Sequence, residues 1–162
     1  MAKLMILGLG NVVHQDKGLG IHAVRDLYHE SWPQEVKFVD RMMLGNSPLN
    51  LHGVQGLLVL DAWQTGKVPG TLIRLSLEQV LDQPDLVSEP SLWRSLVLAD
   101  VLGQNIEVVF LGLEAENTAC NLMLSPPVQM AYHSFLDSVR SEVSCMLSGL
   151  SPSLAIEANV WV

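Results

Sequence analysis

The sequence predicts an α/β fold, a single domain with a mostly parallel twisted sheet and helices on both faces of that sheet. Two observations predict it. Short apolar runs of strand length alternate along the chain with segments whose apolar residues recur at helical spacing. The size agrees, because 162 residues of which 49% are hydrophobic and 16% are charged suit one compact domain.

The first predicted strand and helix flank a glycine-rich stretch. Residues 4–7, LMIL, form an unbroken apolar run that ends at a glycine, as a strand buried on both faces does. In residues 20–30 the apolar side chains follow the helical period, at Ile21, Val24, Leu27 and Tyr28. A helix therefore follows the first strand, and the stretch GLGNVVHQDKGLG, residues 8–20, connects them.

Four further strands are predicted from apolar content and alternation. Residues 35–40 alternate in polarity. Residues 56–62 form a second apolar strand, which ends in a carboxylate. The other two candidates are residues 70–76 and residues 106–113.

Two further helices are predicted, at residues 91–103 and 128–150, the second being long and amphipathic. Residues 82–91 contain two prolines and predict a loop that is too short to divide domains. We therefore assign residues 1–150 to one domain and residues 151–162 to an apolar C-terminal tail that could dock on it.

Composition and charge exclude several classes of function. The net charge is -8 and no cluster of Lys and Arg occurs, so the sequence predicts no nucleic-acid partner. Cys120 and Cys145 lie far apart, without the spacing of a zinc site or a disulfide framework. No secretion signal or membrane-spanning run is recognisable, so we expect a cytoplasmic protein without a membrane partner, and a monomer by default.

Three aspartates follow or end predicted strands: Asp16, Asp40 and Asp61. Ligands of parallel sheets bind outside the carboxyl ends of the strands, so the three side chains are candidates for one shared site. Asp is also common in turns and at helix N-caps, so separate capping roles are the alternative.

The glycine-rich stretch does not fit a nucleotide cradle. The dinucleotide motif G-x-G-x-x-G is met at Gly8 and Gly10, but Val13 stands where the third glycine should be. The P-loop motif is absent, and so is an activated serine or cysteine nucleophile of a known pattern.

Several segments together resemble one family, the hydrogenase maturation endopeptidases. The stretch LGLGNVVHQDKGLGIHAVRDL is similar to their opening G-x-G-N motif, and LLVLDAWQTGKVPGTL is similar to their third strand and its P-G-T turn. VKFVD, LVLADVL and VVFLGL resemble later elements. The resemblance covers residues 3–147.

The resemblance implies a cytosolic α/β endopeptidase that removes a C-terminal extension from the large-subunit precursor of a nickel-iron hydrogenase. The cut follows nickel insertion, and the resemblance implies that the protease recognises the bound nickel. Nickel is then carried by the substrate, and the protein needs no cofactor of its own.

The family's site residues carry over only in part. Asp61 matches one of three nickel-contacting positions, whereas Lys17 and Arg94 occupy the other two. Asp16 and Asp40 match the family's aspartates, so the resemblance implies that they form the catalytic group together with Asp61. The residues expected to bind substrate are Gly10, Asn11, Lys17, Gly18 and Arg94.

Lys17, Asp61 and Arg94 together carry one positive charge, so we expect their site to repel a bare metal ion. The two cations could pair internally with the aspartates, or they could bind an acidic group of the substrate. Alternatively, the alignment is displaced and a neighbour such as His14 is the ligand. Two functions follow, an endopeptidase of this type or a non-catalytic relative that binds a hydrogenase subunit or assembly factor.

Overall fold

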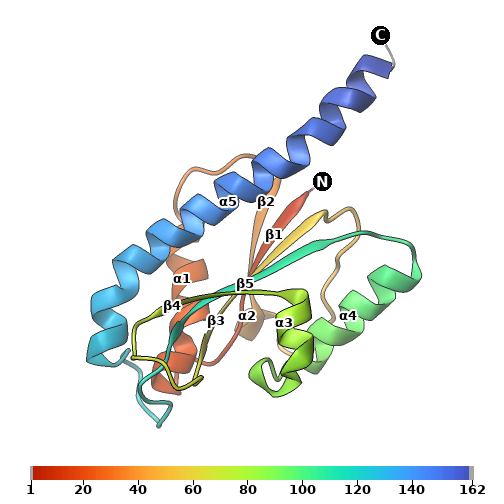
Figure 1. Ribbon diagram of the computed structural model, residues 1–162. Coiled ribbons are helices and arrows are strands. Elements are labelled where there is room, and N and C mark those ends of the chain that lie inside the picture. The colour runs from red at the N-terminus through yellow and green to blue at the C-terminus, as the bar shows by residue number, and fades with distance from the viewer. Residues whose placement is uncertain (1, 161–162) are drawn as a thin grey trace.

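A five-stranded, mostly parallel sheet forms the centre of the molecule (Figure 1). The structure is a computed structural model that describes residues 2–160, and the side chains of residues 2–150. Across the sheet the strand order is β2-β1-β3-β5-β4, and only β4 runs antiparallel to its neighbour. The strands are β1 (Leu4–Gly8), β2 (Val36–Asp40), β3 (Gly56–Trp63), β4 (Leu72–Ser76) and β5 (Glu107–Glu114). The predicted fold class is confirmed.

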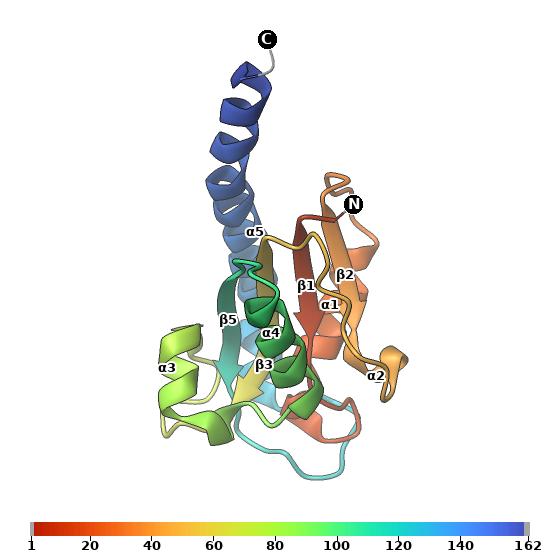
Figure 2. The ribbon, with the colours of Figure 1, turned by 90° about the vertical axis from the view of Figure 1, so that its right-hand side faces the viewer.

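Helices cover both faces of the sheet (Figure 2). The helices are α1 (Leu19–Tyr28), α2 (Arg41–Leu44), α3 (Leu77–Asp82), α4 (Pro90–Val101) and α5 (Pro126–Val160), with 3-10 turns η1 (Gln15–Gly18) and η2 (Pro84–Leu86). α1 and α5 pack on one face, and α3 and α4 pack on the other. None of the helices in the described residues is long and apolar enough to cross a membrane.

The central strand shows why the sheet is buried on both sides. All eight residues of β3 are buried, and the side chains of residues 57–60 alternate between the two apolar clusters. Leu58 and Leu60 face α1 and α5, whereas Leu57 and Val59 face α3 and α4. Pairing with β1 and β5 satisfies the backbone of β3 on both edges, so an unbroken apolar run is stable there.

Glycines let the first helix approach the sheet closely. A Cβ at Gly20 would overlap the carbonyl oxygen of Leu60 on β3, and one at Gly8 would lie 2.8 Å from the Val24 side chain. The glycines of this stretch therefore serve contacts within the chain.

The structure differs from the sequence prediction at the short elements. The Asp40 side chain caps α2, and Ser76 and Gln79 form a capping box that begins α3, so local caps stabilise two helices that apolar period does not reveal. The predicted loop of residues 82–91 contains η2 and the first residues of α4. α5 begins two residues before its predicted start and continues to Val160; docking of the tail concerns side chains outside the described residues.

Candidate functional site

A cavity of about 600 Å³ opens at the carboxyl ends of β1 and β3, the edge where ligands of parallel sheets bind. It adjoins a second cavity of about 390 Å³, and the two cavities share Lys17, Asp85, Leu86 and Thr118. The larger cavity is lined by Leu9, Gly10, Asn11, His14, Lys17, Asp61, Asp85, Leu86, Ser88, Glu89 and Thr118.

An ion pair between Lys17 and Asp61 lies in this cavity. The ammonium Nζ of Lys17 donates to Asp61 Oδ1 at 3.0 Å and to the Ala62 carbonyl oxygen at 2.6 Å. The Asp61 side chain is only 5% exposed and that of Lys17 is 32% exposed. η1 presents Lys17 and the end of β3 presents Asp61, so the pair joins the glycine-rich stretch to the sheet.

Burial dominates the electrostatics of Asp61. Its loss of hydration raises the pKa of the carboxyl above the ordinary value of 3.8, while the Lys17 ammonium and the Ala62 amide act in the opposite direction. Oδ1 also accepts a hydrogen bond from Ala62 N at 2.8 Å. Oδ1 thus has two donors, whereas Oδ2 has no hydrogen-bond donor in the described part of the chain.

Asp16 is bound elsewhere. It is fully buried, and its carboxylate accepts hydrogen bonds from the backbone amides of Glu116, Asn117 and Ser125 and from the Ser125 hydroxyl, at 2.7–3.0 Å. It does not line the cavity. Its place in the structure is to hold the connection between β5 and α5, which brings Thr118 to the cavity wall.

Asp40 also has its own partners. It accepts from the amides of Met42 and Met43 at the start of α2 and pairs with Arg25 Nε at 2.6 Å. Neither Asp40 nor Asp16 lines the cavity with Asp61. The expected shared site of three carboxylates is therefore corrected to a site that contains Asp61, with separate anchoring roles for the other two.

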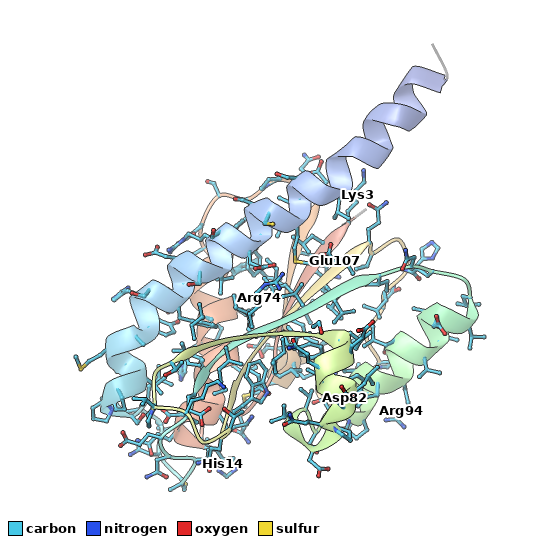
Figure 3. All side chains as sticks on the ribbon, in the orientation of Figure 1. Lys3, His14, Arg74, Asp82, Arg94 and Glu107 are labelled. Atoms are coloured by element: carbon cyan, nitrogen blue, oxygen red, sulfur yellow. The ribbon has the colours of Figure 1, made fainter. Side chains whose placement is uncertain are left out.

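Arg94 is likewise not at the site. It is an exposed residue of α4, and Figure 3 shows it well apart from His14, which lines the cavity. The described part of the chain contains no ion pair to Arg94, so the alternative in which Arg94 pairs with an aspartate is not observed there. The residue that reaches the cavity from the beginning of α4 is Glu89, the N-cap position.

Of the other residues expected to bind substrate, Gly10, Asn11 and Lys17 line the cavity. Gly18 does not; it is buried, and a Cβ on it would lie 2.9 Å from the backbone of Val12. His14, the substitute ligand considered from sequence, does line the cavity.

The sequence analysis did not predict two acidic residues that line the cavity. Asp85 in η2 and Glu89 lie in the segment predicted as a loop, and both line the cavity. Glu89 Oε1 accepts from Arg41 Nε at 3.2 Å and from the Ser91 hydroxyl at 2.6 Å. The cavity walls therefore carry more acidic than basic side chains, which corrects the expected positive balance.

The acidic residues do not make a metal site. Within the described residues, no group of three or more His, Cys, Asp or Glu side chains is arranged to hold a metal ion. The Lys17 ammonium occupies one face of the buried Asp61 carboxylate instead. A direct nickel contact through Asp61 does not fit this arrangement, because an ion at Oδ1 would compete with the ammonium and an ion at Oδ2 would be repelled by the ammonium at the neighbouring oxygen.

No protein-family model and no curated protein sequence matches the chain. Solved structures do match it. The hydrogenase maturating endopeptidase HybD from E. coli superimposes with a TM-score of 0.72 at 22% identity, covering 89% of this chain and 93% of that one.

Two archaeal structures are also similar. The hydrogenase 2 maturation peptidase from a Thaumarchaeota archaeon gives a TM-score of 0.65 at 24% identity, with 87% of this chain and 97% of that one covered. The NiFe hydrogenase maturation protease HybD from Thermococcus kodakarensis gives 0.63 at 21% identity, with 87% and 98% covered. The chain has the fold of the hydrogenase maturation endopeptidases.

This fold covers nearly the whole length of those structures, so the likeness is to the complete domain. In the hydrogenase maturation endopeptidase fold of this chain, the glycine-rich stretch forms one wall of the cavity, and the segment from η2 to the start of α4 forms another. The fold is thus that of the family which the sequence motifs resemble.

Proposed function

We propose that the protein is an endopeptidase of the hydrogenase-maturation type, which removes a C-terminal extension from the large-subunit precursor of a nickel-iron hydrogenase. The observation that carries the proposal is the cavity between the glycine-rich stretch and the end of β3, at the motif positions that resemble the family. The structural relatives support it, because three of them are named as endopeptidase, peptidase or protease of hydrogenase maturation.

The chemistry at the cavity is compatible with binding an extended peptide. Backbone turns at Gly10 and the polar side chains of Asn11, Ser88 and Thr118 can pair with peptide amides and carbonyls. Asp61 is the acidic group best placed to act on the bound chain, since its pKa is raised by burial and its Oδ2 has no donor in the described residues. We assign catalysis to Asp61 and indirect, positioning roles to Asp16 and Asp40.

Nickel enters only as cargo of the substrate. We further propose that the protein works in the cytoplasm as a monomer, where the precursor is assembled, and that it carries no metal of its own.

The proposal is tested by incubating the protein with a purified large-subunit precursor and measuring the intact mass of the precursor over time. Loss of a C-terminal peptide supports the endopeptidase. The control is the variant Asp61→Asn, which keeps the shape of the side chain and should remove the activity. Stable binding without any loss of mass would instead support the non-catalytic relative, which the names of the structural relatives do not favour.

A further inference from the structure

We infer that Lys17 is a built-in cation at Asp61, so that the cavity binds its partner through a hydrogen bond to a neutral peptide carbonyl and without a metal contact to Asp61. The statement about the partner rests on the proposed function. The statement about the metal rests only on the contacts within the cavity. It departs from the nickel contact that the family resemblance implies.

One oxygen of the Asp61 carboxylate is already occupied. Asp61 Oδ1 already accepts from Lys17 Nζ at 3.0 Å and from Ala62 N at 2.8 Å. A metal ion at this oxygen would have to displace the ammonium, which the Ala62 carbonyl also holds at 2.6 Å. Because the carboxylate is buried, its pairing with the ammonium is screened little by water, so a metal ion gains at Asp61 only what exceeds this existing pairing.

The described residues also lack a set of side chains that could hold a metal ion. A divalent transition metal needs several nitrogen, oxygen or sulfur ligands, and the described residues bring no three such side chains together. Glu89 and Asp85 line the cavity, but Glu89 is already bound by Arg41 and Ser91.

Lys17 has one hydrogen-bond donor that remains unused within the described residues. An ammonium has three N–H groups, and two of those on Lys17 are used by Asp61 and Ala62. The third has no acceptor among the described residues, and Lys17 lines both cavities. A second unfilled donor belongs to Trp63, one of the residues that line the smaller cavity, whose buried indole Nε1 has no partner in the described structure.

The acidic walls decide which acceptor fits. Asp85, which has no ion-pair partner among the described residues, would repel a free carboxylate of the partner, whereas a peptide carbonyl is neutral and accepts strongly. The site therefore suits a segment of peptide backbone whose carbonyl oxygen takes the free N–H of Lys17.

The metal part is tested by isothermal titration calorimetry with nickel chloride and cadmium chloride on the full chain. We expect the wild type to show no nickel or cadmium binding that depends on Asp61, so the titrations of the wild type and of Asp61→Asn should be alike. Lys17→Glu replaces the ammonium by a second carboxylate, so it should bind either metal at least about tenfold more tightly than the wild type. Combining it with Asp61→Asn should remove the gain.

Two results would overturn this part. One is wild-type nickel binding that Asp61→Asn weakens by about tenfold or more. The other is a folded Lys17→Glu protein, as judged by circular dichroism, that gains no affinity for either metal. If Lys17→Glu does not fold, the comparison of wild type with Asp61→Asn still decides the point.

The partner part is tested with Lys17→Met, which keeps the length of the side chain but removes the charge and the donors. The probe is a large-subunit precursor in metal-free and nickel-loaded forms. We expect the wild type to bind both forms with similar affinity, and Lys17→Met to bind both about tenfold more weakly. Lys67→Met, at an exposed lysine outside the cavity, is the matched control and should bind as the wild type does.

The outcomes separate this inference from the proposed function. Nickel-dependent binding, or unchanged binding by Lys17→Met, overturns the inference even if the precursor is cut. Equal binding of both forms without cleavage overturns the endopeptidase and supports the inference. If neither form binds, the proposed partner is wrong, and the metal titrations decide the role of Lys17.

Discussion

Removing the Asp16 carboxylate should destabilise the protein more than removing an exposed one. Asp16→Ala deletes the acceptor of four hydrogen bonds from Glu116, Asn117 and Ser125, at a side chain with no solvent exposure. A hydrogen bond to a charged group contributes about 1.5–3 kcal/mol. Because water can enter the vacated space and restore part of that, we expect a total loss of about 3–5 kcal/mol in the free energy of unfolding.

Asp16→Asn should cost less, about 2–3 kcal/mol, because its amide keeps one acceptor but turns its NH₂ toward one of the backbone amides. The assay is urea unfolding followed by circular dichroism, with thermal unfolding as a check. A loss of 3–5 kcal/mol corresponds to a fall in Tm of about 6–20 °C for a chain of this size.

The matched control is Asp137→Asn, whose side chain is 78% exposed and pairs only with Arg140 three residues along α5. It should change the free energy of unfolding by no more than about 0.5 kcal/mol. A loss below about 1 kcal/mol for Asp16→Ala would refute the anchoring role that the hydrogen bonds assign to this carboxylate.

Three further predictions concern the cavity. Burial raises the pKa of Asp61, so the contribution of this carboxyl to stability is complete below pH 3.8 and is lost as the pH rises through the pKa of the folded protein. Lys17→Met should enlarge that loss, which is measured as the free energy of unfolding against pH. Gly10→Ala should cost roughly 2–4 kcal/mol in urea unfolding, because Gly10 has φ +107° and a Cβ would overlap the Lys17 carbonyl oxygen. Arg94→Ala should leave the free energy of unfolding and the affinity for the precursor equal to those of the wild type within error, since Arg94 is exposed and outside the cavity.

The sheet and its main helices follow from the sequence because burial imposes a period on them. β3 is buried along its whole length and reads as an unbroken apolar run, and α1 buries one face and reads as a helix. α2 and α3 are too short to show a period. Their ends are set by single capping side chains, Asp40 and Ser76, whose partners cannot be distinguished in advance from those of any other turn residue.

The site was predictable where it depends on strand ends and not where it depends on loops. The end of β3 and the stretch after β1 bring Asp61 and Lys17 together, as the strand order implies. The partners of Asp16 lie about 100 residues later in a connection between elements, and nothing local points to them.

Arg94 and Glu89 show how a small displacement along a helix changes a site. Arg94 lies five positions after Glu89, and because each residue turns the helix by about 100°, the two side chains point about 140° apart. Arg94 therefore points away from the cavity, whereas Glu89 at the N-cap reaches it. The signal that could have found Glu89 is Pro90, because a proline at the first helical position places the residue before it at the helix start.

The most direct test of the central claim is the intact mass of a hydrogenase large-subunit precursor before and after incubation with this protein, beside the Asp61→Asn variant. We predict that the wild type shortens the precursor by one C-terminal peptide at a single site, and that Asp61→Asn, with an unchanged fold, leaves the mass as it was. An unchanged mass with the wild type, under conditions where a hydrogenase maturation endopeptidase cuts its own precursor, would contradict it.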